Sequence, residues 1–168
     1  YNASRRLAAA GDLQEIVAAV AEGVNVPAVN RAVYWEVEHD AAGAPVALAA
    51  AANWHSGMGT PPLPLGVRFS LEQFPATKLV LSVDPLFVDD LEHDERIDPV
   101  TKAVFRQQNA PAIAVLPLQA GGRQIGSLML VAEEVHRFSE REVRPYISLA
   151  QQMAVTIENR RLFQQTQE

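Results

Sequence analysis

Apolar runs on either side of Gly121 and Gly122 form the clearest pattern in the chain. Two glycines suit the two-residue turn of a β-hairpin, because such turns need positive φ. The pattern predicts a hairpin over residues 112–132. The expected pairs are Ala120 with Arg123, Leu118 with Ile125, Pro117 with Gly126, and Val115 with Leu128. One face then carries Ile113, Val115, Leu128 and Leu130, and the other carries Leu116, Leu118, Ile125, Met129 and Val131. Since both faces are apolar, we expect other elements to cover both.

A long amphipathic helix should follow the hairpin and cover one of these faces. Ser139 and Glu142 have the spacing of a capping box, in which each side chain bonds the backbone N–H of the other. Apolar residues then recur at helical period as far as Ile157. Beyond Ile157 the helix becomes polar but still carries Leu162 and Phe163.

The N-terminal part of the chain predicts two helices and two strands. Residues 1–10 are compatible with a helix that ends at Gly11, and Asp12 with Glu15 predicts the start of a second helix ending near Gly23. Residues 31–39 and 46–54 are strand-like and flank a turn signal. Because alanine is a weak strand former, a helix remains the alternative for 46–54.

The middle of the chain predicts loops and short elements. Residues 57–66 are rich in glycine and proline, and 67–69 and 86–88 are short strand candidates. Pro75 can open a short helix, and Asp98 is the expected N-cap of a helix over 100–108. Short helices and loops should therefore cover the second face of the sheet, where a pocket is easiest to build.

Composition narrows the function classes. The chain has 168 residues, 48% of them hydrophobic, which fits one globular domain. Its net charge of −6 makes nucleic acid and anionic membranes unfavourable partners. The absence of cysteine excludes disulfides, thiolate catalysis and zinc–thiolate sites. No apolar run has the length of a membrane span, so we expect no membrane insertion. Because the first residue is not methionine, we expect a domain from a longer, cytoplasmic polypeptide.

Several segments in this order resemble a GAF domain. They are 114–118 (AVLPL), 121–122 (GG), 125–128 (IGSL), 138–140 (FSE) and 157–162 (IENRRL). The resemblance extends back to the capping residues near position 12 and covers nearly the whole chain. It implies an α+β fold, profilin-like and PAS-related. Such a fold has a central antiparallel sheet of five or six strands, terminal helices on one face, and a pocket of short helices and loops on the other. It also implies a single domain over 1–168, with 1–11 and 158–168 as connector helices.

The resemblance further implies a sensory or regulatory module of a signalling protein, such as a sensor kinase or a cyclase. Family members that reduce methionine sulfoxide or attach a bilin use cysteines that this chain lacks. Residues 67–75 resemble the pocket segment of phytochrome GAF domains, but Gln73 replaces the aspartate expected before Phe74 and Pro75. The Asn-Lys-Phe-Asp-Glu signature of cyclic-nucleotide-binding members is missing as well. We expect no cofactor and an unidentified small-molecule ligand; cyclic nucleotide binding stays open.

The polar candidates predict neither catalysis nor a metal site. His55 and Ser56 could pair as base and nucleophile, but no third orienting group is identifiable. His93 lies in the acidic segment 89–98, which lacks the alternating oxygen ligands of a calcium loop. Haem ligation by one of the four histidines is a minor alternative.

Six aromatic residues are the candidate ligand-binding set, with simple core filling as the alternative for each. They are Trp35, Trp54, Phe69, Phe74, Phe87 and Phe105. Two functions follow: a ligand-sensing module, or a ligand-free dimerisation and relay module.

The terminal helices predict a parallel homodimer linked to effector domains. Leu7, Leu162 and Phe163 are the expected dimer residues, because large apolar side chains beyond the sheet gain stability only when another surface covers them. The alternative is that Leu162 and Phe163 fold back on Leu7 of the same chain.

Overall fold

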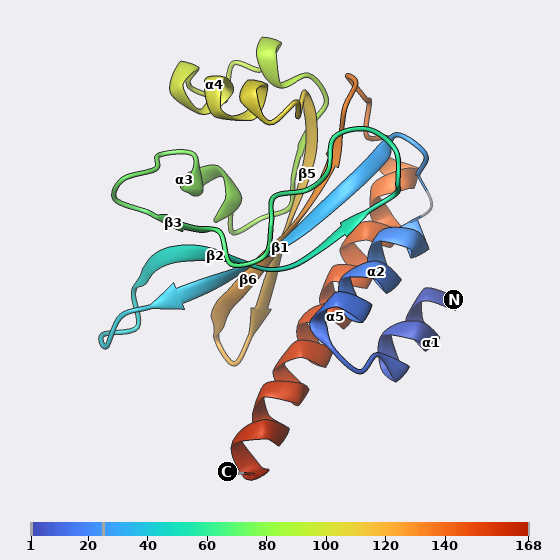
Figure 1. Cartoon of the computed structure of the whole chain (residues 1–168), viewed down its shortest axis with the longest axis vertical. Coiled ribbons are helices and arrows are strands. Elements are labelled where there is room, and N and C mark those ends of the chain that lie inside the picture. The colour runs from blue at the N-terminus through green and yellow to red at the C-terminus, as the bar shows by residue number, and fades with distance from the viewer. Residues whose placement is uncertain (1, 25, 168) are drawn as a thin grey trace.

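The computed structural model describes residues 2–24 and 26–167 and contains one six-stranded antiparallel sheet (Figure 1). The strand order is β3-β2-β1-β6-β5-β4. The strands are β1 (Val29–His39), β2 (Pro45–His55), β3 (Arg68–Ser70), β4 (Leu86–Val88), β5 (Ala112–Ala120) and β6 (Arg123–Ala132). The helices are α1 (Asn2–Ala9), α2 (Leu13–Val24), α3 (Thr77–Val80), the 3-10 turn η1 (Leu91–His93), α4 (Pro99–Gln107) and α5 (Glu140–Gln167). This architecture confirms the predicted α+β fold. Tyr1 and Glu168, the outermost residues of the expected connector helices, lie outside the described residues.

Helices α1, α2 and α5 lie on one face of the sheet, as Figure 1 shows. The apolar cluster beneath them includes Ile16 of α2, Leu116 of β5 and Met153 of α5, all fully buried. The predicted capping box begins α5: Glu142 N–H donates to Ser139 Oγ at 3.2 Å, and Ser139 N–H donates to the Glu142 carboxylate at 3.4 Å. The expectation that α2 and α5 share one face is therefore confirmed.

The opposite face carries α3, α4 and the long loops around them (Figure 1). A second apolar cluster lies here and includes Trp35, Phe105 and Met129. Helix α4 begins as predicted, because the Asp98 carboxylate accepts from Thr101 N–H at 2.8 Å and Pro99 occupies the first turn. The sheet thus separates two apolar layers, called here the helix layer (beneath α1, α2 and α5) and the pocket layer (beneath α3 and α4).

A β-bulge at Ile125 corrects the predicted register of the terminal hairpin. Ala120 pairs with Arg123 as expected, but Leu118 pairs with Gly126, so Ile125 is an extra residue on β6. Beyond the bulge the partners are Pro117 with Ser127, Leu116 with Leu128, and Val115 with Met129. The pairs predicted for Leu118, Pro117 and Val115 are wrong by one residue.

The bulge also changes which side chains share a face. Leu116, Leu118, Leu128 and Leu130 lie in the helix layer, whereas Ile113, Val115, Met129 and Val131 lie in the pocket layer. Side chains alternate between the two faces of a strand, so one added residue moves the side chains beyond it to the opposite face. The faces predicted for Leu128, Leu130, Met129 and Val131 are therefore exchanged.

The close approach of β1 to Gly126 accompanies this bulge. A Cβ at Gly126 would lie 2.4 Å from Tyr34 Cε1 and 2.6 Å from the Trp35 carbonyl oxygen. The Tyr34 ring, only 1% exposed, therefore occupies the space that any other residue at 126 would need.

Leu7 is a core residue, so its expected role in a dimer surface is wrong. It is 2% exposed and packs in the helix layer of its own chain. Helix α1 sits tightly on α2, since a Cβ at Gly23 would lie only 2.3 Å from Ala3 Cβ. Phe163 is 65% exposed and does not fold back on Leu7.

Among the described residues, no helix combines the length and the apolar character that crossing a bilayer would require.

Candidate functional site

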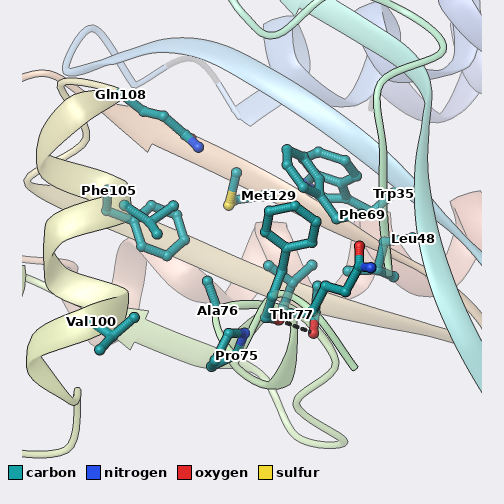
Figure 2. Close-up of a pocket in the computed structure, with 14 residues that line it drawn as sticks. Trp35, Leu48, Phe69, Pro75, Ala76, Thr77, Val100, Phe105, Gln108 and Met129 are labelled. Carbon is teal, nitrogen blue, oxygen red and sulfur yellow. Dashed lines mark hydrogen bonds between the residues drawn. The ribbon is translucent and has the colours of Figure 1, made fainter. Parts of the chain in front are cut away.

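A cavity of about 180 Å³ lies in the pocket layer, between the sheet and the segments that carry α3 and α4 (Figure 2). Its walls come from four parts of the chain: the central strands, β3, the segment 73–80 and α4. The lining residues are Trp35, Leu48, Phe69, Gln73, Phe74, Pro75, Ala76, Thr77, Val80, Val100, Val104, Phe105, Gln108 and Met129. Four of the six predicted aromatic residues are among them, namely Trp35, Phe69, Phe74 and Phe105.

Three aromatic rings form a continuous wall on one side of the cavity. The Trp35 and Phe69 ring centroids are 5.6 Å apart, and Phe69 meets Phe74 edge to face at 4.9 Å. Both distances are in the range favoured by aromatic pairs. Trp35 is 3% exposed whereas Phe74 is 40% exposed, so the wall runs from the core to the cavity mouth.

Helix α4 forms the facing wall. Phe105 is buried and points toward the cavity, while Val100 is exposed at the mouth (Figure 2). Met129 of β6 lies between the two walls, and Gln108, just past the end of α4, extends toward it (Figure 2). The thioether of Met129 suits aromatic neighbours because sulfur contacts ring edges favourably.

The polar groups at this cavity are few and uncharged. Thr77 Oγ1 donates to the Phe74 carbonyl at 2.6 Å and is therefore already paired. Trp35 Nε1 is buried and has no hydrogen-bond partner within the described residues. None of the described lining residues carries a charge. The arrangement can hold a neutral, mainly apolar molecule. Burying an unpaired charge here would cost more free energy than the contacts of the ligand with the walls contribute.

Trp54 lies in the helix layer, so its predicted place at the cavity is wrong. Its Nε1 donates to Glu22 of α2 at 3.0 Å. The cause is a bulge in β2: Trp35 pairs with Ala50 and Tyr34 pairs with Ala52, which leaves Ala51 as an extra residue. Strict alternation from the cavity residue Leu48 would place Trp54 on the cavity side, and the extra residue reverses this.

Phe87 also lies in the helix layer, contrary to prediction. Its ring is 5.7 Å from Phe138 and 6.4 Å from Tyr146 of α5. In the three-residue strand β4, Val88 and Leu86 face the pocket layer, and alternation turns the middle residue to the opposite side.

Sequence reasoning missed a buried arginine that fixes the wall formed by α4. Arg31 is 4% exposed and donates to the carbonyl oxygens of Gln108 and Asn109, the latter at 3.0 Å. These carbonyls follow the last turn of α4, where a cation is favourable. Arg31 also forms an ion pair with Glu133 at 3.5 Å. Desolvation lowers the pKa of Arg31, and the charge of Glu133 opposes part of this change. An arginine side chain is nevertheless always protonated in proteins.

The residues around Arg31 also fix the glycine- and proline-rich loop over residues 57–66. Glu133 accepts from Thr60 N–H. Hydrogen bonding by the Thr60 side chain, and then by its backbone N–H, holds the pKa of Glu133 below its ordinary value. Asn109 Nδ2 donates to Thr60 Oγ1 at 3.1 Å, and Asn30 Nδ2 donates to the Met58 carbonyl at 3.0 Å. We call Asn30, Arg31, Thr60, Asn109 and Glu133 the Arg31 cluster. The signal in the sequence was an arginine at the start of an apolar strand.

The other polar candidates are placed apart from the cavity. The imidazole of His55 and the hydroxyl of Ser56 each contact the backbone of Met58. His93 pairs with Asp90 at 2.8 Å in an exposed segment. Among the described residues, no three metal-ligating side chains gather in one place.

Solved structures similar to this chain include domains of a putative sensor histidine kinase and of phytochromes. The phycocyanobilin-bound GAF domain of a cyanobacterial phytochrome superposes with a TM-score of 0.76 at 18% identity, over 95% of this chain and 94% of that one. The domain of a putative two-component sensor histidine kinase from Sinorhizobium meliloti 1021 gives 0.67 at 19% identity, over 95% and 100%. The chromophore-binding domain of the R. palustris bacteriophytochrome RpBphP3 gives 0.74 at 16% identity, over 93% of this chain and 58% of that one. At these identities the likeness shows the fold alone.

A search of curated protein sequences found no match. The family model for the GAF domain matches residues 10–158, which include every strand, the cavity and most of α5. The chain therefore belongs to the GAF domain family.

Proposed function

We propose that this chain is a non-catalytic sensory domain that binds a small molecule in the cavity between the sheet and α4. The observation that carries the proposal is the cavity itself: about 180 Å³ of space within an otherwise packed apolar layer. Concave, mainly apolar spaces lined by a few polar groups are typical of small-molecule sites. Membership of a family whose solved members include sensor domains supports the same conclusion.

Signal relay would run through the strands to the helix layer. Trp35 and Met129 face the cavity, and their strand neighbours Tyr34 and Leu128 are buried against the helix layer. A ligand that displaces Trp35 therefore acts on β1, which contacts α2 directly and carries Tyr34 in the helix layer. We propose residues 1–11 and 158–168 as connectors to other domains, with a histidine kinase or a cyclase as the linked effector and the cytoplasm as the location.

Thermal denaturation in the presence of small molecules tests this function. A ligand at about 100 times its Kd should add about 2.7 kcal/mol to the free energy of unfolding and raise Tm. Ala76→Phe should abolish the rise by filling the cavity mouth, whereas Ala42→Phe in the exposed turn after β1 should preserve it. The proposal fails if no compound distinguishes the two variants and mass spectrometry of the denatured protein finds no copurified molecule.

Ligand-free dimerisation and relay is the second candidate function. The observation that favours it is a line of exposed apolar side chains along the outer half of α5. Val155 is 59% exposed, Leu162 is 47% exposed and Phe163 is 65% exposed. Val155 and Leu162 are seven residues apart, so they lie on the same side of the helix and could meet a second α5.

A further inference from the structure

We propose that the cavity selects an uncharged aromatic molecule with one hydrogen-bond acceptor, and that Trp35 Nε1–H donates to that acceptor. This inference rests on the proposed function and names the ligand class for the same cavity. Three features of the cavity carry it: size, wall chemistry and an unpaired donor.

The size restricts the ligand to about one or two rings. An engineered apolar cavity of roughly 150 Å³ holds benzene, and this cavity has about 180 Å³. A benzene ring with a small substituent therefore fits. A tetrapyrrole, which has four five-membered pyrrole rings joined in a chain, is far too large for the cavity in this form.

The walls favour an aromatic ligand without charge. Phe69 and Phe105 lie on opposite sides of the space, and the Met129 side chain lies between them in this view (Figure 2). A flat aromatic guest can use ring faces, ring edges and sulfur together. A carboxylate or phosphate would find no cation among the described lining residues, so anionic metabolites are disfavoured.

The unpaired donor supplies the polar requirement. Buried side-chain donors in proteins nearly always have a partner, and leaving one unmade is costly. Within residues 2–24 and 26–167, Trp35 Nε1 and Ser127 Oγ are the buried side-chain polar atoms without one. The two residues are direct partners across β1 and β6. Ser127 precedes Leu128, which faces the helix layer, so Ser127 faces the pocket layer with Trp35. Both unpaired groups thus lie on the cavity side of the sheet. Nε1 is itself covered in the structure, so a ligand oxygen or nitrogen accepts from it once the indole shifts toward the cavity.

Three probes of similar shape separate these requirements. Acetophenone has a ring and a neutral acceptor, ethylbenzene has the ring without the acceptor, and benzoate has the ring with a charge. The chain contains two tryptophans, so an ¹H–¹⁵N spectrum has two indole N–H signals. The Trp54 signal is an internal control, because that N–H is already bonded to Glu22 in the other layer.

We expect acetophenone to bind about 3- to 10-fold more tightly than ethylbenzene, as one neutral hydrogen bond provides. Acetophenone should shift the Trp35 indole signal and leave that of Trp54 in place, and benzoate should bind more weakly than either. Trp35→Phe should bring the affinity ratio of acetophenone to ethylbenzene close to one while ethylbenzene still binds. The wild-type spectrum tests the hydrogen bond even if this variant fails to fold.

Equal affinity of acetophenone and ethylbenzene, with an unmoved Trp35 signal, overturns the acceptor requirement. Preferential binding of benzoate overturns the neutral class. If none of the probes binds while another compound raises Tm of wild type but not of Ala76→Phe, this inference is wrong and the proposed function stands. If no probe binds and no other compound raises Tm of wild type selectively, the inference and the proposed function are both wrong.

Discussion

Replacement of Arg31 by methionine should destabilise the domain far more than the same replacement at an exposed arginine. Methionine keeps much of the apolar stem but removes every donor. Arg31 donates to two backbone carbonyls, to Asn30 Oδ1 at 3.2 Å and to the Glu133 carboxylate at 3.5 Å. Its loss leaves these acceptors without their cation at the end of α4.

The magnitude follows from burial. Removing one partner of a buried ion pair costs about 3–5 kcal/mol. Glu133 has a side chain that is 26% exposed, so water can solvate part of its charge after the substitution. We therefore expect Arg31→Met to lower the free energy of unfolding by about 2–4 kcal/mol, somewhat less than for a fully buried pair. For a domain of this length, Tm should fall by about 5–15 °C.

Arg68→Met is the matched control. Arg68 pairs with Glu38 at 2.8 Å, shorter than the Arg31 pair, but the two side chains are 55% and 36% exposed. Exposed pairs contribute about 0–1 kcal/mol, so burial and not distance decides the difference. Arg31→Lys should fall between wild type and Arg31→Met, because an ammonium keeps the charge but cannot present the planar fork of donors.

Urea denaturation monitored by circular dichroism measures all four proteins, with the slope m compared to check that each unfolds as a unit. Stabilities of Arg31→Met and Arg68→Met within about 0.5 kcal/mol of each other would refute the reasoning, since this is the ordinary scatter of surface substitutions. The Arg31 cluster would then be a by-product of packing and not a support for α4.

Three further predictions concern other parts of the molecule. Gly126→Ala should lower the free energy of unfolding by about 1–3 kcal/mol in urea denaturation, because its Cβ would meet the Tyr34 ring at 2.4 Å; an unchanged midpoint contradicts this. Because folding lowers the pKa of Glu133, its ionised carboxylate stabilises the fold at pH values above 4.5, the ordinary pKa of the group. This contribution is lost as the pH falls through the lowered pKa of the folded state. Wild type should therefore lose more stability than Glu133→Gln between about pH 5 and about pH 3, and parallel stability curves would count against the contact. Replacing Leu162 and Phe163 together by glutamate should convert a dimer to a monomer in sedimentation velocity. A wild type that is already monomeric at high concentration, or a double variant that stays dimeric, tells against the α5 interface.

The fold could be predicted because its signals are local. The Gly121 turn, the Ser139 capping box and the Asp98 cap each depend on residues within one turn of helix or hairpin. The alanine-rich segment of β2 was ambiguous, and pairing with β1 on one side and β3 on the other settled it as a strand. Tertiary pairing overrides weak intrinsic preference in such a position.

The two bulges could not be predicted, because their causes are distant in the sequence. The extra residue Ile125 adjoins the point where β1 packs Tyr34 against Gly126, and the extra residue Ala51 lies opposite Tyr34 and Trp35. Strict alternation of side chains along each strand predicts the face of Trp35 correctly and that of Trp54 wrongly, although both are tryptophans in strands. The Arg31 cluster was equally hidden, since it joins four segments that only the folded chain brings together.

The separation of the core into two layers has a consequence for hydrogen exchange. The pocket layer is covered by the four-residue helix α3, the nine-residue helix α4 and loops, whereas the helix layer includes the 28-residue helix α5. Local opening of a protein starts where few buried contacts and few backbone hydrogen bonds hold a segment. Amides of α3 should therefore exchange through small openings that leave β6 and α5 protected. The cavity can then admit and release its occupant through such openings while the helices that lead out of the domain stay folded.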